Sequence, residues 1–194
     1  TIDTDQYIPV HNPTGKICIG WSGSVSTIQH FEHVIPVLKK IKQKYANQVV
    51  FKVIGDESYQ NKELGIIGLP WDIESEIIEL SSFDIGIMPL PDNEWTRGKC
   101  GLKGLQYMAL ETATVMSPVG VNSEIVSNGE NGFLADSVHD WIDKLSKLIE
   151  DKNLRIKLGQ EGRKTVISKY SVKALSKQYI NYFCEAIDQT KNHL

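Results

Sequence analysis

One stretch of the chain, residues 85–135, constrains the fold more than any other. It alternates apolar runs with a helical pattern, and each apolar run leads into a glycine-containing loop. The expected elements are a strand at 85–90, a helix at 102–110 and a strand at 115–118. A strand that leads through a glycine loop into a helix N-terminus typically binds an anion, because free N–H groups and the positive end of the helix dipole face the ligand.

Three basic residues surround the start of this predicted helix. Arg97 and Lys99 lie in the loop, Lys103 lies just inside the helix, and a second glycine loop follows at Gly120. Such side chains form charge-assisted hydrogen bonds with phosphate oxygens. The pattern predicts a phosphate site, although charges of this kind are also typical of an ordinary solvated loop.

Composition narrows the class of protein. The 194 residues suffice for one domain or slightly more. A net charge of −3 gives no reason to expect nucleic acid or strong membrane binding, and no apolar run approaches the ~20 residues of a membrane-spanning helix. The three cysteines are far apart and odd in number, which indicates reduced thiols in a cytoplasmic protein. Cys100 is expected to fill space rather than to act as a nucleophile.

The rest of the chain alternates strand and helix patterns. Apolar runs predict further strands at 16–21, 48–55, 64–69 and 131–135. Apolar residues spaced three and four apart predict helices at 28–45, 73–80, 138–149, 153–169 and 172–188. Continuously apolar strands indicate a parallel sheet covered on both faces. The predicted fold class is therefore α/β, a Rossmann-like three-layer open parallel sheet of about six strands.

In such a sheet, ligands bind beyond the carboxyl ends of the strands. The segment SGSVST at 22–27 lies on that edge and is a second candidate anion loop, through Gly23 and Ser24, although it also suits plain turn geometry. Trp71 on the same edge either stacks on a base or fills the edge of the core. Trp95 either stacks on a sugar or packs within its loop. The histidines show no metal spacing and are expected at the surface.

The central stretch resembles a known family. GKCGLKGLQYMALETATVMSPVGVNSEIVSNGENGFLA and the preceding FDIGIMPL are similar to the nucleotide-sugar-binding half of group 1 (family 4) glycosyltransferases of the two-domain GT-B fold. IDTDQYIP near the N-terminus and KYS at 169–171 resemble the segments that connect the two domains. The chain begins with Thr1, so residues 1–15 are expected to connect to a missing N-terminal domain. Residues 16–194 would form the donor domain.

The resemblance implies a function. Such enzymes transfer a sugar from a nucleoside diphosphate to an acceptor with retention of anomeric configuration, commonly without a metal or other cofactor. The expected partners are the nucleoside-diphosphate sugar and the missing acceptor domain, through which the protein would associate peripherally with the inner face of the cytoplasmic membrane. Cell-envelope polysaccharide or lipopolysaccharide synthesis is the expected pathway. An alternative is an inactive nucleotide-binding module of the same fold.

The resemblance also assigns roles to residues. Arg97 and Lys99 are the expected catalytic side chains. The expected donor-binding residues lie along the same sheet edge and are Gly23, Ser24, Leu69, Trp71, Gly98, Cys100, Gly101, Lys103, Gln106, Gly120 and Glu124. Backbone groups at Leu69 would contact the base. Gln106 would contact the ribose, unless it is a plain core amide. Glu124 would either cap a short helix or lie near the sugar.

Five positions depart from the family pattern. Gly98 and Gln106 stand where two glutamates are usual, and Trp21 and Ser26 stand where an arginine and a lysine are usual. The cations are therefore expected to come from the central loop instead. Glu111 stands where a helix-ending glycine is usual, and a left-handed conformation there would cost ~1 kcal/mol.

Overall fold

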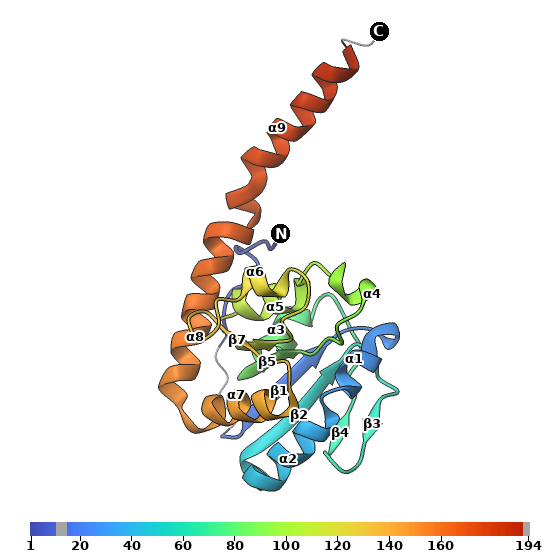
Figure 1. Cartoon of the computed structure of the whole chain (residues 1–194), viewed down its shortest axis with the longest axis vertical. Coiled ribbons are helices and arrows are strands. Elements are labelled where there is room, and N and C mark those ends of the chain that lie inside the picture. Colours follow the sequence, from blue (N-terminus) through green and yellow to red (C-terminus); the bar gives the residue numbers. More distant parts are fainter. Residues whose placement is uncertain (11–14, 192–194) are drawn as a thin grey trace.

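The fold is a parallel sheet covered by helices on both faces (Figure 1). A computed structural model describes residues 1–10 and 15–191, and side chains as far as residue 188. The sheet has five strands in the order β2-β1-β5-β6-β7. Their bounds are β1 Ile17–Ser22, β2 Val49–Ile54, β5 Ile85–Met88, β6 Ala113–Met116 and β7 Phe133–Leu134. All four neighbouring pairs are parallel, which confirms the predicted α/β class.

The two faces of the sheet have separate cores. Alternate strand side chains, such as Ile19 and Ile87, pack under α2 (Ile35–Tyr45) and α7 (Val138–Glu150). The residues between them face α3 (Glu76–Ser81) and α5 (Leu102–Ala109). On that second face Gly86 leaves room for the ring of Tyr107, since a Cβ there would lie 2.4 Å from it. This close approach fixes α5, which carries the predicted anion site, over the centre of the sheet.

The helix predicted at 28–45 is interrupted. A 3-10 turn, Val25–Thr27, leads into α1 (Ile28–Glu32), and α2 begins separately at Ile35. Pro36 stands in the first turn of α2, where its missing N–H costs nothing, but it could not continue a helix from α1. A second 3-10 turn, Ala46–Gln48, leads into β2.

The segment 64–69 does not form the predicted sixth strand. Instead β3 (Gln60–Asn61) and β4 (Ile66–Ile67) form a small antiparallel hairpin. Leu69 joins the outer edge of β2 through one parallel bridge to Ile54. The segment therefore extends the sheet by a single residue.

Two short helices lie in the loops at the carboxyl edge. The loop predicted at 91–101 contains α4 (Glu94–Arg97), which Asn93 caps by accepting a hydrogen bond from the Thr96 backbone N–H at 3.0 Å. The other helix, α6, spans Asn122–Ile125 after β6.

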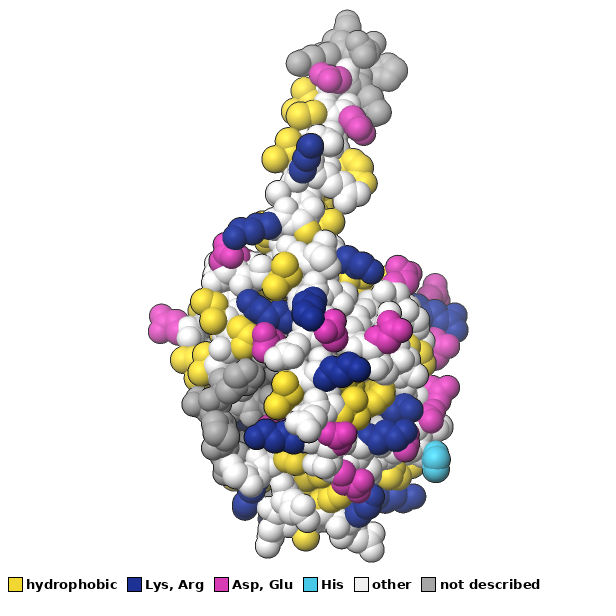
Figure 2. Space-filling model, turned by 90° about the vertical axis from the view of Figure 1, so that its left-hand side faces the viewer, with side chains coloured by type: hydrophobic (Ala, Val, Ile, Leu, Met, Phe, Trp, Pro, Cys, Tyr) yellow, Lys and Arg dark blue, Asp and Glu magenta, His cyan; other side chains and the backbone are white. Residues whose placement is uncertain are grey.

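The first residues of the chain meet the start of α9 (Val172–Lys191). The Ile2 N–H donates to the Tyr170 carbonyl and the Val172 N–H donates to the Ile2 carbonyl, each at 2.9 Å, and Lys173 donates to Asp5 at 2.8 Å. The rest of α9 projects from the body (Figure 1). Figure 2 shows apolar side chains exposed along this helix. Tyr179, Ile180 and Phe183 are among its exposed apolar residues. None of the described helices combines the length and apolar character needed to cross a membrane.

Helix α8 (Lys152–Thr165) continues into a π-helical turn, Val166–Tyr170, before α9. It packs through Gly159, where an added Cβ would lie 1.9 Å from the backbone oxygen of Glu111. Glu111 has a φ of 59°, which confirms the left-handed conformation expected there. The close approach holds α8 against the end of α5.

We expect Gly159→Ala to destabilise the protein by about 1–3 kcal/mol, although alanine favours helices, because a backbone oxygen cannot yield to the methyl group. Chemical denaturation measures this. Gln160→Ala, an exposed neighbour on α8, is the control and should change stability by less than about 0.5 kcal/mol. Equal stabilities of the two variants would show that α8 can move away from Glu111.

Candidate donor-binding site

The loops after β1, β5 and β6 meet at the carboxyl edge of the sheet. Ser117 connects the second and third of them, because its N–H donates to the Met88 carbonyl at 3.1 Å and its hydroxyl accepts from the Leu90 N–H at 2.9 Å. Gly120 has a φ of 55°, and a Cβ there would lie 2.4 Å from the Arg97 carbonyl oxygen. The two glycine loops of the central stretch are therefore in contact, as the sequence predicts.

The N-terminus of α5 opens onto this edge. Gly101 occupies the cap position in a left-handed conformation, with a φ of 71°, and no side chain caps the helix. The first-turn N–H groups of a helix have no partners within it. They stand next to Lys99 and Lys103, so the structure brings together the anion-binding elements that the sequence predicts.

Lys99 and Lys103 lie against tryptophans rather than carboxylates. The Nζ of Lys99 is 3.7 Å from the ring centroid of Trp95, and the Nζ of Lys103 is 5.7 Å from that of Trp21. Neither lysine has an ion-pair partner in the described part of the chain. Burial lowers the pKa of Lys103, and the charge of Lys99 lowers it further. This site holds positive charge without a compensating acid, which favours an anionic ligand.

His30 lies beside the lysines and is the clearest functional candidate that sequence reasoning missed. The prediction of a surface position is wrong for this histidine, whose side chain is 4% exposed, although His33 and His139 are exposed. (His11 and His193 lie outside the described residues.) The centroid of its ring lies 5.3 Å from that of Trp95, with the two ring planes tilted by 39°, and neither ring nitrogen has a hydrogen-bond partner among the described residues. Burial, followed by the charges of Lys99 and Lys103, lowers the pKa of His30.

The guanidinium group of Arg97 is paired with a carboxylate in this structure. It makes two hydrogen bonds to Asp92, at 2.6 and 3.0 Å, and both side chains are exposed. The pair lowers the pKa of Asp92 and raises that of Arg97. Of the two residues predicted as catalytic, only Lys99 is therefore unpaired among the described side chains.

A second cluster lies on the other side of α5, around Glu76 at the start of α3. One Glu76 carboxylate oxygen accepts from the Trp71 indole N–H at 2.9 Å and from the Gln106 amide at 3.2 Å, and the other accepts from the Tyr7 hydroxyl at 3.0 Å. Gln106 also donates to Tyr7 at 2.7 Å. Trp71 is 52% exposed, so of its two predicted roles the one that fills the edge of the core is wrong. Sequence reasoning placed Glu76 in the predicted helix at 73–80 and gave it no role in a site.

The other predicted site residues have mixed placements. The Leu69 backbone is already occupied, because its N–H donates to Val53 and its carbonyl accepts from Gly55. Ser24 caps the 3-10 turn beside Gly23, and its hydroxyl lies 3.0 Å from that of Ser26. The remaining ones, Gly98, Cys100 and Glu124, are exposed on the same edge. Exposure contradicts the space-filling role expected for Cys100.

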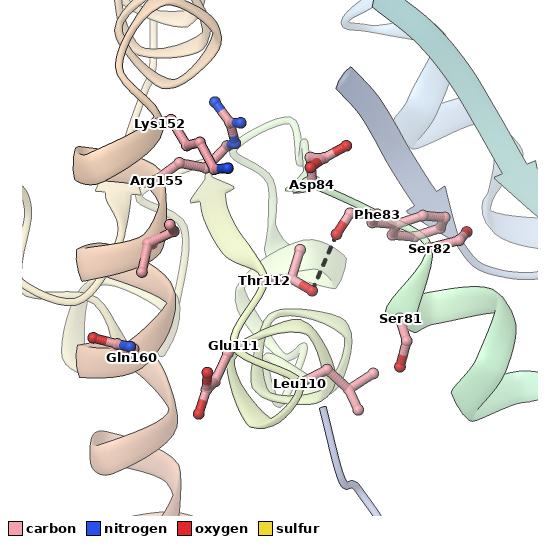
Figure 3. A pocket seen from close by; sticks show the side chains of 11 residues that line it. Ser81, Ser82, Phe83, Asp84, Leu110, Glu111, Thr112, Lys152, Arg155 and Gln160 are labelled. Carbon is pink, nitrogen blue, oxygen red and sulfur yellow. Dashed lines mark hydrogen bonds between the residues drawn. The ribbon is translucent and has the colours of Figure 1, made fainter. Parts of the chain in front are cut away.

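A cavity of about 320 Å³ lies away from this edge (Figure 3). Its lining includes Asp84 and Thr112, which directly precede β5 and β6, and Lys152 and Arg155 of α8. These positions place it at the amino ends of the strands. Arg155 donates to the Leu148 carbonyl, so part of the cavity lining has a structural role. The described residues contain no group of three or more His, Cys, Asp or Glu side chains that could hold a metal ion.

Comparison with known proteins agrees with the α/β fold of the structure and with the glycosyltransferase family that the sequence resembles. The family model described as "Glycosyl transferases group 1" matches residues 16–151, and this chain belongs to that family. No curated protein matches the chain in sequence.

Solved structures share the fold. The C-terminal domain of a group 1 family protein, LpcC, from Francisella tularensis is 24% identical over 89% of this chain and 100% of its own, with a TM-score of 0.74. Anabaena HepE, in complex with UDP and glucose, is 13% identical over 94% of this chain and 55% of its own (TM-score 0.76). WaaG, a glycosyltransferase involved in lipopolysaccharide biosynthesis, is 11% identical over 85% of this chain and 46% of its own, with a TM-score of 0.68. The chain thus spans about half the length of HepE and WaaG.

The Glu76 cluster should contribute to stability. Replacing Glu76 by Ala removes the acceptor of three donors, so we expect the free energy of unfolding to fall by about 1–2 kcal/mol. Glu74→Ala, on the exposed side of the same segment, is the control. If both variants unfold at the same denaturant concentration, water replaces Glu76 without cost.

His30 should make stability depend on pH. Because its pKa in the folded state lies below the ordinary value of 6.5, the unfolded chain binds a proton that the folded chain does not. We therefore expect the free energy of unfolding to decrease as the pH falls below about 6.5. Denaturation between pH 7.5 and 5 should show a smaller decrease for His30→Phe than for the unmodified protein, with His139→Phe, an exposed histidine on α7, as the control. Identical slopes in all three proteins would show that His30 protonates freely.

Proposed function

We propose that this chain is the donor-binding domain of a retaining glycosyltransferase that takes a hexose from a nucleoside-diphosphate sugar. The main support is the uncapped start of α5 with two lysines that have no acidic partner in the described structure. A diphosphate supplies the missing negative charge at this position. The complex of HepE with UDP and glucose, a protein of the same fold, supports a nucleotide-sugar ligand.

In this proposal the cations stabilise the leaving group. When the glycosidic bond breaks, negative charge develops on the diphosphate oxygen, and preorganised donors aimed at that oxygen lower the barrier. Lys99, Lys103 and the first-turn N–H groups of α5 would supply these donors, so no metal is required. Arg97 would join them by exchanging its exposed partner Asp92 for a phosphate.

The Glu76 cluster would bind the nucleoside. Trp71 presents an exposed indole ring, and its N–H is fixed by Glu76. Gln106 and Glu76 together offer an amide and a carboxylate to the ribose hydroxyls. Thus Glu76 would provide the carboxylate that the family usually has at the position of Gln106.

The missing half of the enzyme would bind the acceptor. The first residues and the start of α9 lie side by side, which suits two connections to one N-terminal domain. We propose that the acceptor belongs to cell-envelope polysaccharide or lipopolysaccharide, by analogy with WaaG, and that the enzyme works in the cytoplasm at the inner face of the membrane.

The second candidate function is an inactive nucleotide-binding module. Trp21, which stands where the family usually has an arginine, is 1% exposed in the core, and Gly98 has no side chain for the sugar. Assaying the full-length protein with a panel of nucleoside-diphosphate sugars separates the two functions. Binding without transfer or hydrolysis would favour the module.

Charge removal tests the diphosphate site. We expect Arg97→Ala combined with Lys99→Ala to weaken diphosphate binding by ~30- to 1,000-fold, because charged hydrogen bonds to phosphate are the strong kind. Nucleoside binding should change far less. Calorimetry with UDP and uridine, and with GDP and guanosine, provides the measurement.

The charge-matched control replaces Lys62 and Lys157, which are exposed elsewhere on the molecule, by Ala. It separates specific contacts from the loss of two positive charges. Equal losses of nucleotide and nucleoside affinity in the Arg97 and Lys99 variant would place these residues outside the phosphate site.

A further inference from the structure

We propose that His30 is a further donor-binding residue, which hydrogen-bonds an oxygen of the donor diphosphate once Trp95 moves off it. The inference rests on the proposed function and adds to it a residue from α1 and a mobile cover from α4. Two independent observations carry it: the unpartnered imidazole of His30, and the contacts of Trp95 with both that imidazole and Lys99.

The His30 imidazole is buried without partners. Both its nitrogens are shielded from solvent and lack a hydrogen bond, although the side chain is 4% exposed. Burying an unpaired polar group costs free energy, so native proteins rarely leave one without a structural or ligand partner. The hydroxyl groups of the preceding turn do not pair with the His30 nitrogens, because the Ser24 hydroxyl hydrogen-bonds to those of Ser26 and Thr27. A ligand that reached the ring would recover this cost.

The surroundings of His30 favour an anion. Lys99, Lys103 and His33 all add positive potential at the ring. Burial, followed by these charges, lowers the pKa of His30 and favours the neutral imidazole, in which one nitrogen carries a proton that it can donate and the other accepts. A phosphate oxygen accepts the first bond, and a sugar hydroxyl of the donor can supply the second.

Trp95 covers the ring but is held weakly itself. It belongs to the four-residue helix α4, is 55% exposed, and contacts both the His30 ring and the ammonium group of Lys99. The buried hydroxyl of Thr96 anchors α4 through Pro91 and Asn93, so the Trp95 side chain can rotate while the backbone stays in place.

Lys99 couples the cover to the ligand. A cation over an exposed indole is worth less than a charge-assisted hydrogen bond to phosphate. A diphosphate at the start of α5 therefore draws Lys99 away from Trp95, which removes one of the two contacts that hold the indole over His30. Because the ligand gains the His30 hydrogen bond only in the uncovered state, it favours that state.

Affinity measurements on single and double variants test the proposal, with pyrophosphate, UDP and GDP as probes. His30→Phe keeps a buried ring and removes both nitrogens, so the affinity for all three probes should fall about tenfold, while uridine and guanosine binding is unchanged. His33→Phe, its exposed neighbour, should stay within about twofold of the unmodified chain. Trp95→Ala should bind pyrophosphate about threefold more tightly, and this gain should be smaller in the His30→Phe background.

A spectroscopic measurement on the unmodified chain provides a second test of the proposal. The imidazole nitrogen resonances of His30, assigned by their loss in His30→Phe, should shift when pyrophosphate is added. If His30→Phe binds pyrophosphate normally, or the His30 resonances do not move while the Arg97→Ala and Lys99→Ala double variant loses affinity, the inference is wrong and the proposed function stands. If the unmodified chain binds none of the probes, the proposed function and the inference both fail.

Discussion

The arrangement of the candidate site depends on the hydroxyl group of Tyr107. This side chain is fully buried on α5, and its oxygen accepts from the Ser22 N–H at 2.8 Å and lies 3.1 Å from the Ser22 hydroxyl. Its ring fits over Gly86 of β5 and contacts Phe83 edge-on. One residue thus fixes α5 to the carboxyl end of β1. The lysines before and within α5 are thereby held beside the first loop, where the family usually places its own cations.

The sequence predicted the class of the sheet well, because continuously apolar strands that alternate with amphipathic helices indicate a parallel sheet covered on both faces. It placed the strands 85–90 and 115–118 and the helix 102–110 within two residues of their observed bounds. The prediction from sequence was wrong where a local feature, such as a proline, outweighed the apolar periodicity. Pro36 separates α1 from α2 within one continuous apolar pattern. The run 64–69 is apolar like a strand, but most of it forms a hairpin, and pairing partners cannot be deduced from composition.

The candidate site was less predictable than the fold. Arg97, Lys99 and Lys103 could be named because charge and glycine spacing are visible along the chain, and the structure brings the two lysines together. Their partners could not be named, since contacts between Gln106 and Tyr7, 99 residues apart, depend on tertiary packing. The burial of His30 was hidden for the same reason. Its place in α1 suits exposure, and Trp95, from α4 far along the chain, packs against it.

Trp21 explains why the positive charge has moved. Where the family usually has an arginine, this chain has an indole packed in the core against Phe31 at 5.6 Å. A buried indole cannot bind phosphate, but its face attracts a cation, and Lys103 lies over it. An arginine at position 21 would replace this attractive ring face by a like charge, which disfavours an ammonium group beside it. The tryptophan and the lysine therefore form one unit, which carries the charge on α5 instead of on the first loop and makes the pairing of Lys103 with Trp21 the feature to look for in related chains.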